Sequence, residues 1–188
     1  PYGSSEIIST CMKLSLLECA VTVCDGAGTV IASSSDLIQA IGARLTGILR
    51  TSPIKSVMKQ IRDHGGFILD ESSARIDQAE GVAKAVQLGY RRVAVTVASV
   101  NSHWIDGIRR VEKEKGVEVA VFSVCNTCAS EVDTDRILAG ADVVCASASR
   151  LVRERIGASA VMQLGVAIPV FVLTKLGKRL ILAYLAEF

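Results

Sequence analysis

Thiols, carboxylates and small hydroxyl side chains in this chain follow short runs of β-branched residues. In an α/β protein, ligands bind beyond the carboxyl ends of the parallel strands, where loops and helix N-termini present unpaired amides. The loops after the predicted strands are therefore the candidate functional sites of the chain. They span residues 24–29, 70–73, 99–102, 125–128, 145–149 and 174–178.

Glycines make the first of these loops a candidate anion site, because they let a phosphate approach the main chain. We expect Asp25, Gly26, Gly28 and Thr29 to contact a small phosphate-bearing ligand. The segment lacks the third glycine of a dinucleotide-binding loop and the Gly-Lys-Ser/Thr of a P-loop. A β-hairpin with an Asp-Gly turn explains the same residues, so both interpretations stay open.

Two serines in the loop at residues 145–149 form a second candidate anion site. Ser147 and Ser149 precede a predicted helix, whose N-terminus would favour a negative charge. Capping of that helix by a serine side chain is the competing interpretation.

Cysteines define an alternative chemistry. Cys125 and Cys128 form a Cys-x-x-Cys motif, and Cys24 and Cys145 also lie at the ends of predicted strands. Four thiolates would complete a zinc site or an iron–sulfur site if their strands were neighbours. Because cysteine is also a common small hydrophobe at buried strand ends, a purely structural role is the competing interpretation.

Helical and strand patterns alternate along the chain and predict the fold. Right-handed crossovers between them give a Rossmann-like α/β fold, a mainly parallel sheet of about six strands with helices on both faces. We expect residues 1–188 to form a single domain that lacks an N-terminal region of the full-length protein.

Several helix boundaries carry specific signals. Ser52 followed by Pro53 predicts a helix start, and a glycine at 116 predicts a helix end. Asp77, with Glu80 three residues later, resembles a capping box. A short helix is expected over residues 134–139.

Composition excludes two classes of partner. The chain has 21 basic and 19 acidic residues, a net charge of +2, and no long basic run, so nucleic acid binding is not expected. Its most apolar run, residues 166–173, is shorter than the roughly 20 residues of a membrane span. Six cysteines without a recognisable signal peptide indicate a cytoplasmic protein with reduced thiols.

Four segments carry a family resemblance that extends over nearly the whole chain. They are VCDGAGTVI at 23–31, TSPI at 51–54, RIDQ and EGV within 75–82, and GYRRVAVTVA at 89–98. Together and in this order they resemble methanogenesis marker protein 8, an archaeal family of unknown function. The resemblance implies a context but no catalytic residue, and the Cys125–Cys128 pair does not look like a fixed feature of that family.

The expected function joins the site to this context. We expect a protein of methanogenesis or one-carbon metabolism that binds a small anionic ligand or cofactor and assists the maturation of an enzyme or cofactor. The alternatives are a metal or iron–sulfur protein and a non-enzymatic assembly partner. The expected partners are a small-molecule ligand or a methanogenesis enzyme, and the sequence leaves homo-oligomer formation and enzymatic activity open.

Overall fold

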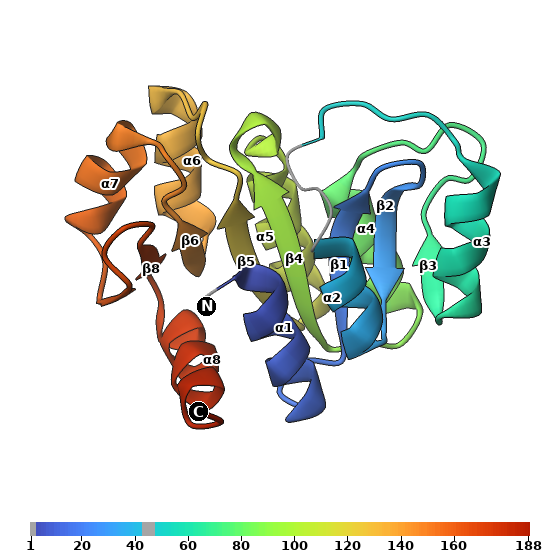
Figure 1. Ribbon diagram of the computed structural model, residues 1–188, viewed down its shortest axis with the longest axis horizontal. Helices are drawn as coiled ribbons and strands as arrows, with labels where there is room; N and C mark the ends of the chain where they lie inside the picture. The colour runs from blue at the N-terminus through green and yellow to red at the C-terminus, as the bar shows by residue number, and fades with distance from the viewer. Residues whose placement is uncertain (1–2, 43–47) are drawn as a thin grey trace.

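The computed structural model describes residues 3–42 and 48–188 (Figure 1). Within them, one sheet of eight strands has the order β3-β2-β1-β4-β5-β6-β8-β7. The strands are β1 (Cys19–Cys24), β2 (Gly28–Ala32), β3 (Gly66–Ile68), β4 (Arg92–Ala98), β5 (Glu118–Val124), β6 (Val143–Cys145), β7 (Met162–Leu164) and β8 (Val170–Val172).

One helix precedes the first strand, one follows the last, and the others lie between strands in the chain. The helices are α1 (Ser4–Lys13), α2 (Ser35–Gly42), α3 (Lys55–Asp63), α4 (Gln78–Gln87), η1 (Ser99–Asn101), α5 (Trp104–Lys115), α6 (Glu131–Gly140), α7 (Arg150–Gly157) and α8 (Lys175–Leu185). No helix in residues 3–42 or 48–188 is long and apolar enough to cross a membrane.

The sheet is mixed, which corrects the prediction of a mainly parallel sheet of about six strands. β1, β4, β5 and β6 are parallel, whereas β2 and β3 on one side and β8 and β7 on the other pair antiparallel. Short connections explain the difference. Residues 25–27 join β1 to β2 and residues 165–169 join β7 to β8, and neither can span a crossover, which needs about a dozen residues.

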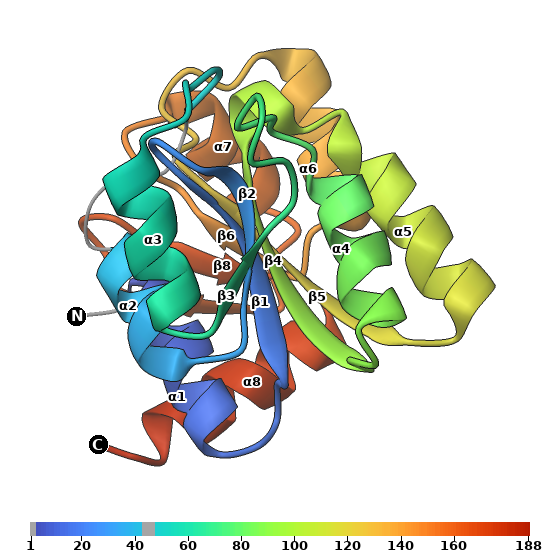
Figure 2. The same ribbon diagram turned by 90° about the vertical axis from the view of Figure 1, so that its right-hand side faces the viewer.

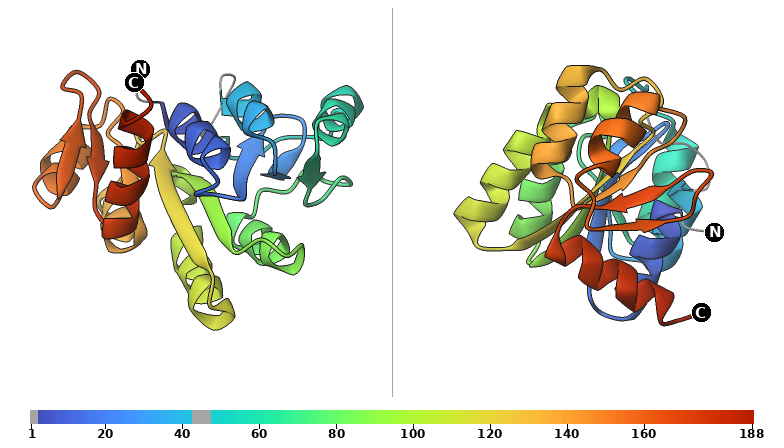
Figure 3. Two further views of the ribbon diagram at one scale, coloured as in Figure 1. Left: turned by 90° about the horizontal axis from the view of Figure 1, so that it is seen from below. Right: turned by 90° about the vertical axis from the view of Figure 1, so that its left-hand side faces the viewer.

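Helices cover both faces of the sheet, as predicted. α1, α2, α3 and α8 pack on one face, and α4, α5, α6 and α7 pack on the other (Figure 2). Figure 3 shows α1 and α8 beside each other on their shared face. The structure is therefore a three-layer α/β fold.

The size of the side chains on the central strands sets how closely the helices of each layer approach the sheet. Ala20, Ala94 and Ala120 pair in one row across β1, β4 and β5 and belong to the core beneath α1 and α8. The next residue of each strand is a valine, which packs in the core beneath α4 and α5. The alanine row lets α1 and α8 lie close to the sheet, because small side chains leave room for the helices.

β1 and β4 separate at their carboxyl ends. Their pairing stops at Val21 with Val95, whereas β4 stays paired with β5 through Ala98. The buried side chain of Gln78 donates a 3.4 Å hydrogen bond to the Thr96 carbonyl oxygen. The chain leaves β1 toward one side of the sheet and β4 toward the other, so this gap is the topological switch point where open α/β sheets bind ligands.

An ion pair between the half-buried Arg109 and the buried Asp142 lies at the opposite, amino edge of the sheet. Arg109 lies 2.6 Å from Asp142, which also accepts hydrogen bonds from the Val121 amide and the Thr174 hydroxyl. Burial lowers the pKa of Arg109, but the carboxylates of Asp142 and Glu112 together outweigh it, so that pKa is raised. Because β8 is antiparallel, the loop at 174–178 belongs to this edge, which corrects its predicted place among the carboxyl-edge loops.

Candidate functional site

The glycine loop forms the turn of the β1–β2 hairpin. Cys24 pairs with Gly28, and the intervening turn is closed by a 3.1 Å bond from the Ala27 amide to the Cys24 carbonyl oxygen. The Gly26 amide donates to the Thr51 hydroxyl at 2.8 Å, and that hydroxyl donates to the Asp25 carboxylate. The Gly26 amide and one carboxylate oxygen of Asp25 are thus bonded within the protein.

Gly28 and Thr29 are covered by the segment that follows β3. A Cβ at Gly28, where φ is +70°, would lie 2.2 Å from the Ala74 carbonyl oxygen. Thr29 is fully buried; its amide donates to the Arg75 carbonyl oxygen, and its hydroxyl accepts from the Asp77 amide. The hairpin interpretation thus accounts for all four residues, and ligand contact at this loop stays a prediction.

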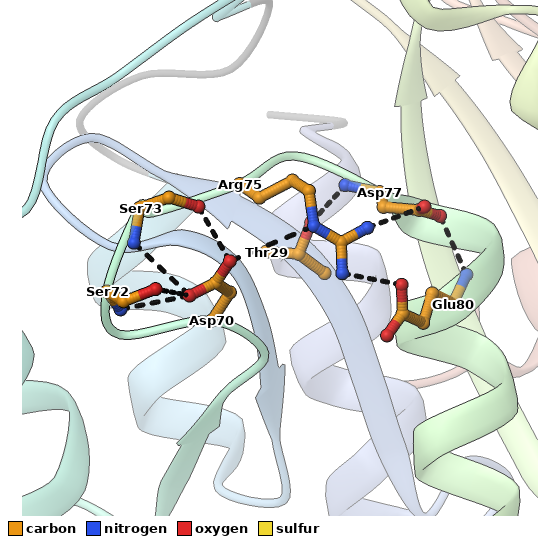
Figure 4. A network of polar contacts seen from close by, with 7 residues as sticks. All are labelled: Thr29, Asp70, Ser72, Ser73, Arg75, Asp77 and Glu80. Atoms are coloured by element: carbon orange, nitrogen blue, oxygen red, sulfur yellow. Dashed lines mark hydrogen bonds and ion pairs between the residues drawn. The ribbon is translucent and has the colours of Figure 1, made fainter.

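Arg75 holds the covering segment in place (Figure 4). Its guanidinium lies 3.8 Å from Asp70, 3.0 Å from Asp77 and 2.6 Å from Glu80. Asp77 also caps α4 by accepting from the Glu80 amide, which confirms the predicted cap. The Arg75 side chain therefore joins the loop after β3 to the first turn of α4.

Asp70 organises the turn before Arg75. Its carboxylate accepts from the hydroxyl and amide groups of both Ser72 and Ser73 (Figure 4). The Ser72 hydroxyl, with the Ser73 hydroxyl and amide, holds the pKa of Asp70 well below its usual range. Asp70, Asp77 and Glu80 therefore all bind groups within the protein, and their carboxylates form a structural network that fixes this loop.

The four candidate metal ligands are not brought together. Cys24 ends β1, which is separated from β5 by β4, and Cys128 is exposed in the loop after β5. Among the described residues, no three His, Cys, Asp or Glu side chains are grouped so that they could hold a metal ion. Only Cys125 and Cys145, at the ends of the neighbouring strands β5 and β6, face a common space.

That space is a cavity of about 360 Å³ at the switch point, which we call the edge cavity. It lies between the first turn of α1 and the carboxyl halves of β1, β4, β5 and β6. Its lining comprises Gly3, Ser4, Ser5, Glu6, Ile8, Thr22, Ile38, Gly42, Thr96, Val124, Cys125, Cys145 and Ser147. Three residues of the predicted sites therefore meet here, together with a helix that sequence reasoning did not place at the site.

Asn126 clamps the two loops of the edge cavity. It is fully buried, donates a 2.7 Å bond to the Cys145 carbonyl oxygen and accepts a 3.0 Å bond from the Ser123 hydroxyl. The main-chain amide of Asn126 donates a 3.1 Å hydrogen bond to the Ser147 hydroxyl. Cys125 and Ser147 both have a φ of +52°, a left-handed conformation that the clamp helps to maintain. The sequence gave no indication that Asn126 would form these hydrogen bonds.

Ser149, by contrast, serves its helix. Its hydroxyl accepts from the Val152 amide and caps α7, as the competing interpretation predicted. It does not line the edge cavity, whereas Ser147 does.

Glu6 lies over the N-terminus of α1. A Cβ on Gly3, the N-cap residue, would lie 1.9 Å from the Glu6 carboxylate, which also accepts from the Ser5 hydroxyl at 3.1 Å. A carboxylate is favoured there because the first amides of a helix are unpaired and carry partial positive charge. No lysine, arginine or histidine occurs among the described residues that line the edge cavity.

A second hollow of about 670 Å³ lies between α2 and α3. Apolar side chains make up most of its wall, and Cys24 and Asp25 lie on it. This hollow and the edge cavity share no lining residue, and different residues of α2 line each of them.

These features define a three-layer α/β protein with a cavity, at the switch point of a mixed sheet, whose lining includes hydroxyl and thiol groups. The chain belongs to the family described as "uncharacterized protein conserved in archaea" (DUF2099), whose model matches residues 1–186. It is 34% identical over 182 residues to an uncharacterized protein of the archaeon Methanocaldococcus jannaschii. The match covers 97% of this chain but only 63% of that relative. The resemblance seen in the sequence is thus confirmed as membership of an archaeal family of uncharacterized proteins.

Proposed function

We propose that the protein binds a small anionic ligand or cofactor in the edge cavity. The observation that supports this most is the convergence of Thr22, Thr96, Cys125, Cys145 and Ser147 on one cavity at the switch point. A volume of about 360 Å³ falls in the range of about 300–1,000 Å³ typical of small-molecule sites.

The surroundings of Glu6 favour a carboxylate as the anionic group. The Glu6 side chain occupies the position at the α1 N-terminus where a ligand anion would sit. When the Glu6 side chain turns outward, a ligand carboxylate of the same charge takes the place of the Glu6 carboxylate. A phosphate dianion is less favoured, because the lining residues that the structure describes supply amides and hydroxyl groups but no cationic side chain. Thr22 and Thr96, whose hydroxyl oxygens are 2.9 Å apart, would bond to polar groups deeper in the ligand.

The metabolic setting is part of the same proposal. The resemblance to methanogenesis marker protein 8 and the source of the relative favour a role in methanogenesis or one-carbon metabolism, in the maturation of an enzyme or cofactor. Because this chain spans 63% of that relative's length, the role of the whole protein is part of the proposal.

Amide chemical shifts of the isotopically labelled chain test the site. Titration with succinate should move the amides of residues 3–6, 126 and 147, while sodium chloride at matched ionic strength leaves them in place. The Ser147→Ala variant should bind about fivefold more weakly, the effect of one hydrogen bond of about 1 kcal/mol. Ser159→Ala, at an exposed serine outside the cavity, is the matched control. Shifts confined to residues 25–29 would instead place the ligand at the glycine loop.

A metal centre is the second candidate, because Cys125 and Cys145 face the same cavity. Two thiolates are fewer than the four ligands of a structural zinc site, so other ligands would have to complete it. Elemental analysis of anaerobically purified protein tests this. Stoichiometric zinc or iron that is lost in a Cys125→Ser/Cys145→Ser variant would favour the metal over the carboxylate ligand.

A further inference from the structure

Cys125 directly follows β5, and Cys145 is the last residue of the neighbouring strand β6. Ser123 of β5 pairs with Val144 of β6, so Cys145 lies beside Val124 and one residue short of Cys125. Ideal strand geometry, with a spacing of about 4.8 Å and a rise of about 3.3 Å, would put the two Cα atoms about 6 Å apart. Disulfide bonds join Cα atoms that are about 4.4–6.8 Å apart, a range that includes this spacing.

The environments of the two thiols differ in a useful way. Cys125 is exposed, and Cys145 is half-buried in the edge cavity with the Ser147 hydroxyl 4.0 Å from its sulfur. An accessible thiol can attack a substrate, and a sheltered neighbour can then resolve the product. The fully buried thiols are different, since burial raises the pKa of both Cys11 and Cys19 to about 12 and leaves them protonated.

The Asn126 clamp keeps the pair together. Because Asn126 follows Cys125 directly and bonds to the Cys145 carbonyl oxygen, the two loops are held as one unit. The left-handed conformation of Cys125 redirects its side chain from the strict alternation of a strand, and both cysteines line the same cavity.

We infer that Cys125 and Cys145 form a redox-active thiol pair that reduces low-molecular-weight disulfides. The Cys125 thiolate attacks one sulfur of the substrate, which forms a mixed disulfide and releases one small thiol. The Cys145 thiolate then attacks the Cys125 sulfur, which forms the Cys125–Cys145 bond and releases the second small thiol. The protein loses two electrons and two protons, and the substrate disulfide gains them. This activity goes beyond ligand binding and does not depend on it.

Cys128 is the competing partner for Cys125. The two are spaced as in a Cys-x-x-Cys motif, and the Ala129 amide bonds to the Asn126 carbonyl oxygen, so the chain turns between them. Cys128 does not line the edge cavity, to which Cys125 and Cys145 are the only cysteines that contribute. The sheet register therefore favours Cys145 as the resolving thiol.

Peptide mapping after treatment of the reduced chain with hydroxyethyl disulfide tests the pair. The wild type and Cys128→Ser should both yield a peptide cross-linked between Cys125 and Cys145. Cys145→Ser should lose the cross-link and retain hydroxyethanethiol on Cys125. Thermal melting by circular dichroism checks that each variant is folded.

Two results would overturn the inference. One is a wild-type cross-link between Cys125 and Cys128 that disappears in Cys128→Ser without a Cys145 bond. The other is a Cys145→Ser variant in which Cys125 stays unmodified. Because succinate is absent from this assay, a failure of ligand binding leaves its result unchanged.

Discussion

The side-chain amide of Asn126 donates a 2.7 Å hydrogen bond to the carbonyl oxygen of Cys145 and thereby ties the end of β5 to the end of β6. Cys125 directly precedes Asn126, and the main-chain amide of Asn126 donates to the Ser147 hydroxyl. The two loops of the edge cavity are therefore joined at one buried residue, through its side chain and its main chain.

Asn126→Ala should reduce the free energy of unfolding by about 2–4 kcal/mol, because it leaves the Cys145 carbonyl and the Ser123 hydroxyl buried without their partner. Urea denaturation measures the change. The exposed Ser159→Ala should stay within about 0.5 kcal/mol of the wild type. An Asn126→Ala variant as stable as this control would show that the clamp contributes nothing.

Gly28→Ala should destabilise the protein far more than Gly116→Ala. Both glycines have a positive φ, +70° and +61°, so alanine carries a similar backbone strain of about 1–2 kcal/mol at either position. Only at Gly28 would the new Cβ meet main chain, 2.2 Å from the Ala74 carbonyl oxygen; at Gly116 nothing lies within 4 Å. Equal shifts in urea midpoint for the two variants would mean that residues 74–75 do not cover the hairpin.

Acid should weaken the protein partly through Asp70. Hydrogen bonds from Ser72 and Ser73 lower the pKa of Asp70 in the folded state, so its stabilising effect is complete above the unfolded value of about 3.9. That contribution is lost as the pH falls through the lower folded pKa. In a Ser72→Ala/Ser73→Ala variant, the urea midpoint should therefore depend less steeply on pH below about 4 than in the wild type. If the urea midpoint of the variant fell with pH below about 4 as steeply as that of the wild type, the result would argue against this network.

Local signals in the sequence located many elements. Asp77 caps α4, and Gly116 ends α5 in the left-handed conformation, both as predicted. The Ser52–Pro53 signal was two residues early, because α3 begins at Lys55 after the Ile54 amide bonds to the Gly26 carbonyl oxygen. The predicted helix at 134–139 begins instead at Glu131, where Ser130 and Asp133 form a capping box.

The candidate site was less accessible to sequence reasoning. Strand ends with thiols and serines were recognised, but which of them meet depends on strand order and on antiparallel edges. The place of α1 beside the cavity and the cross-strand bonds of Asn126 arise from residues far apart in the chain, so local periodicity contained no signal for either.

The central claim is that the edge cavity takes a ligand carboxylate in the place of the Glu6 side chain. Isothermal titration of the wild type and Glu6→Gln with succinate tests it most directly. Because the neutral amide neither occupies the α1 N-terminus as an anion nor repels one, Glu6→Gln should bind succinate severalfold more tightly, roughly 1 kcal/mol. Unchanged or weaker binding by Glu6→Gln would contradict the claim.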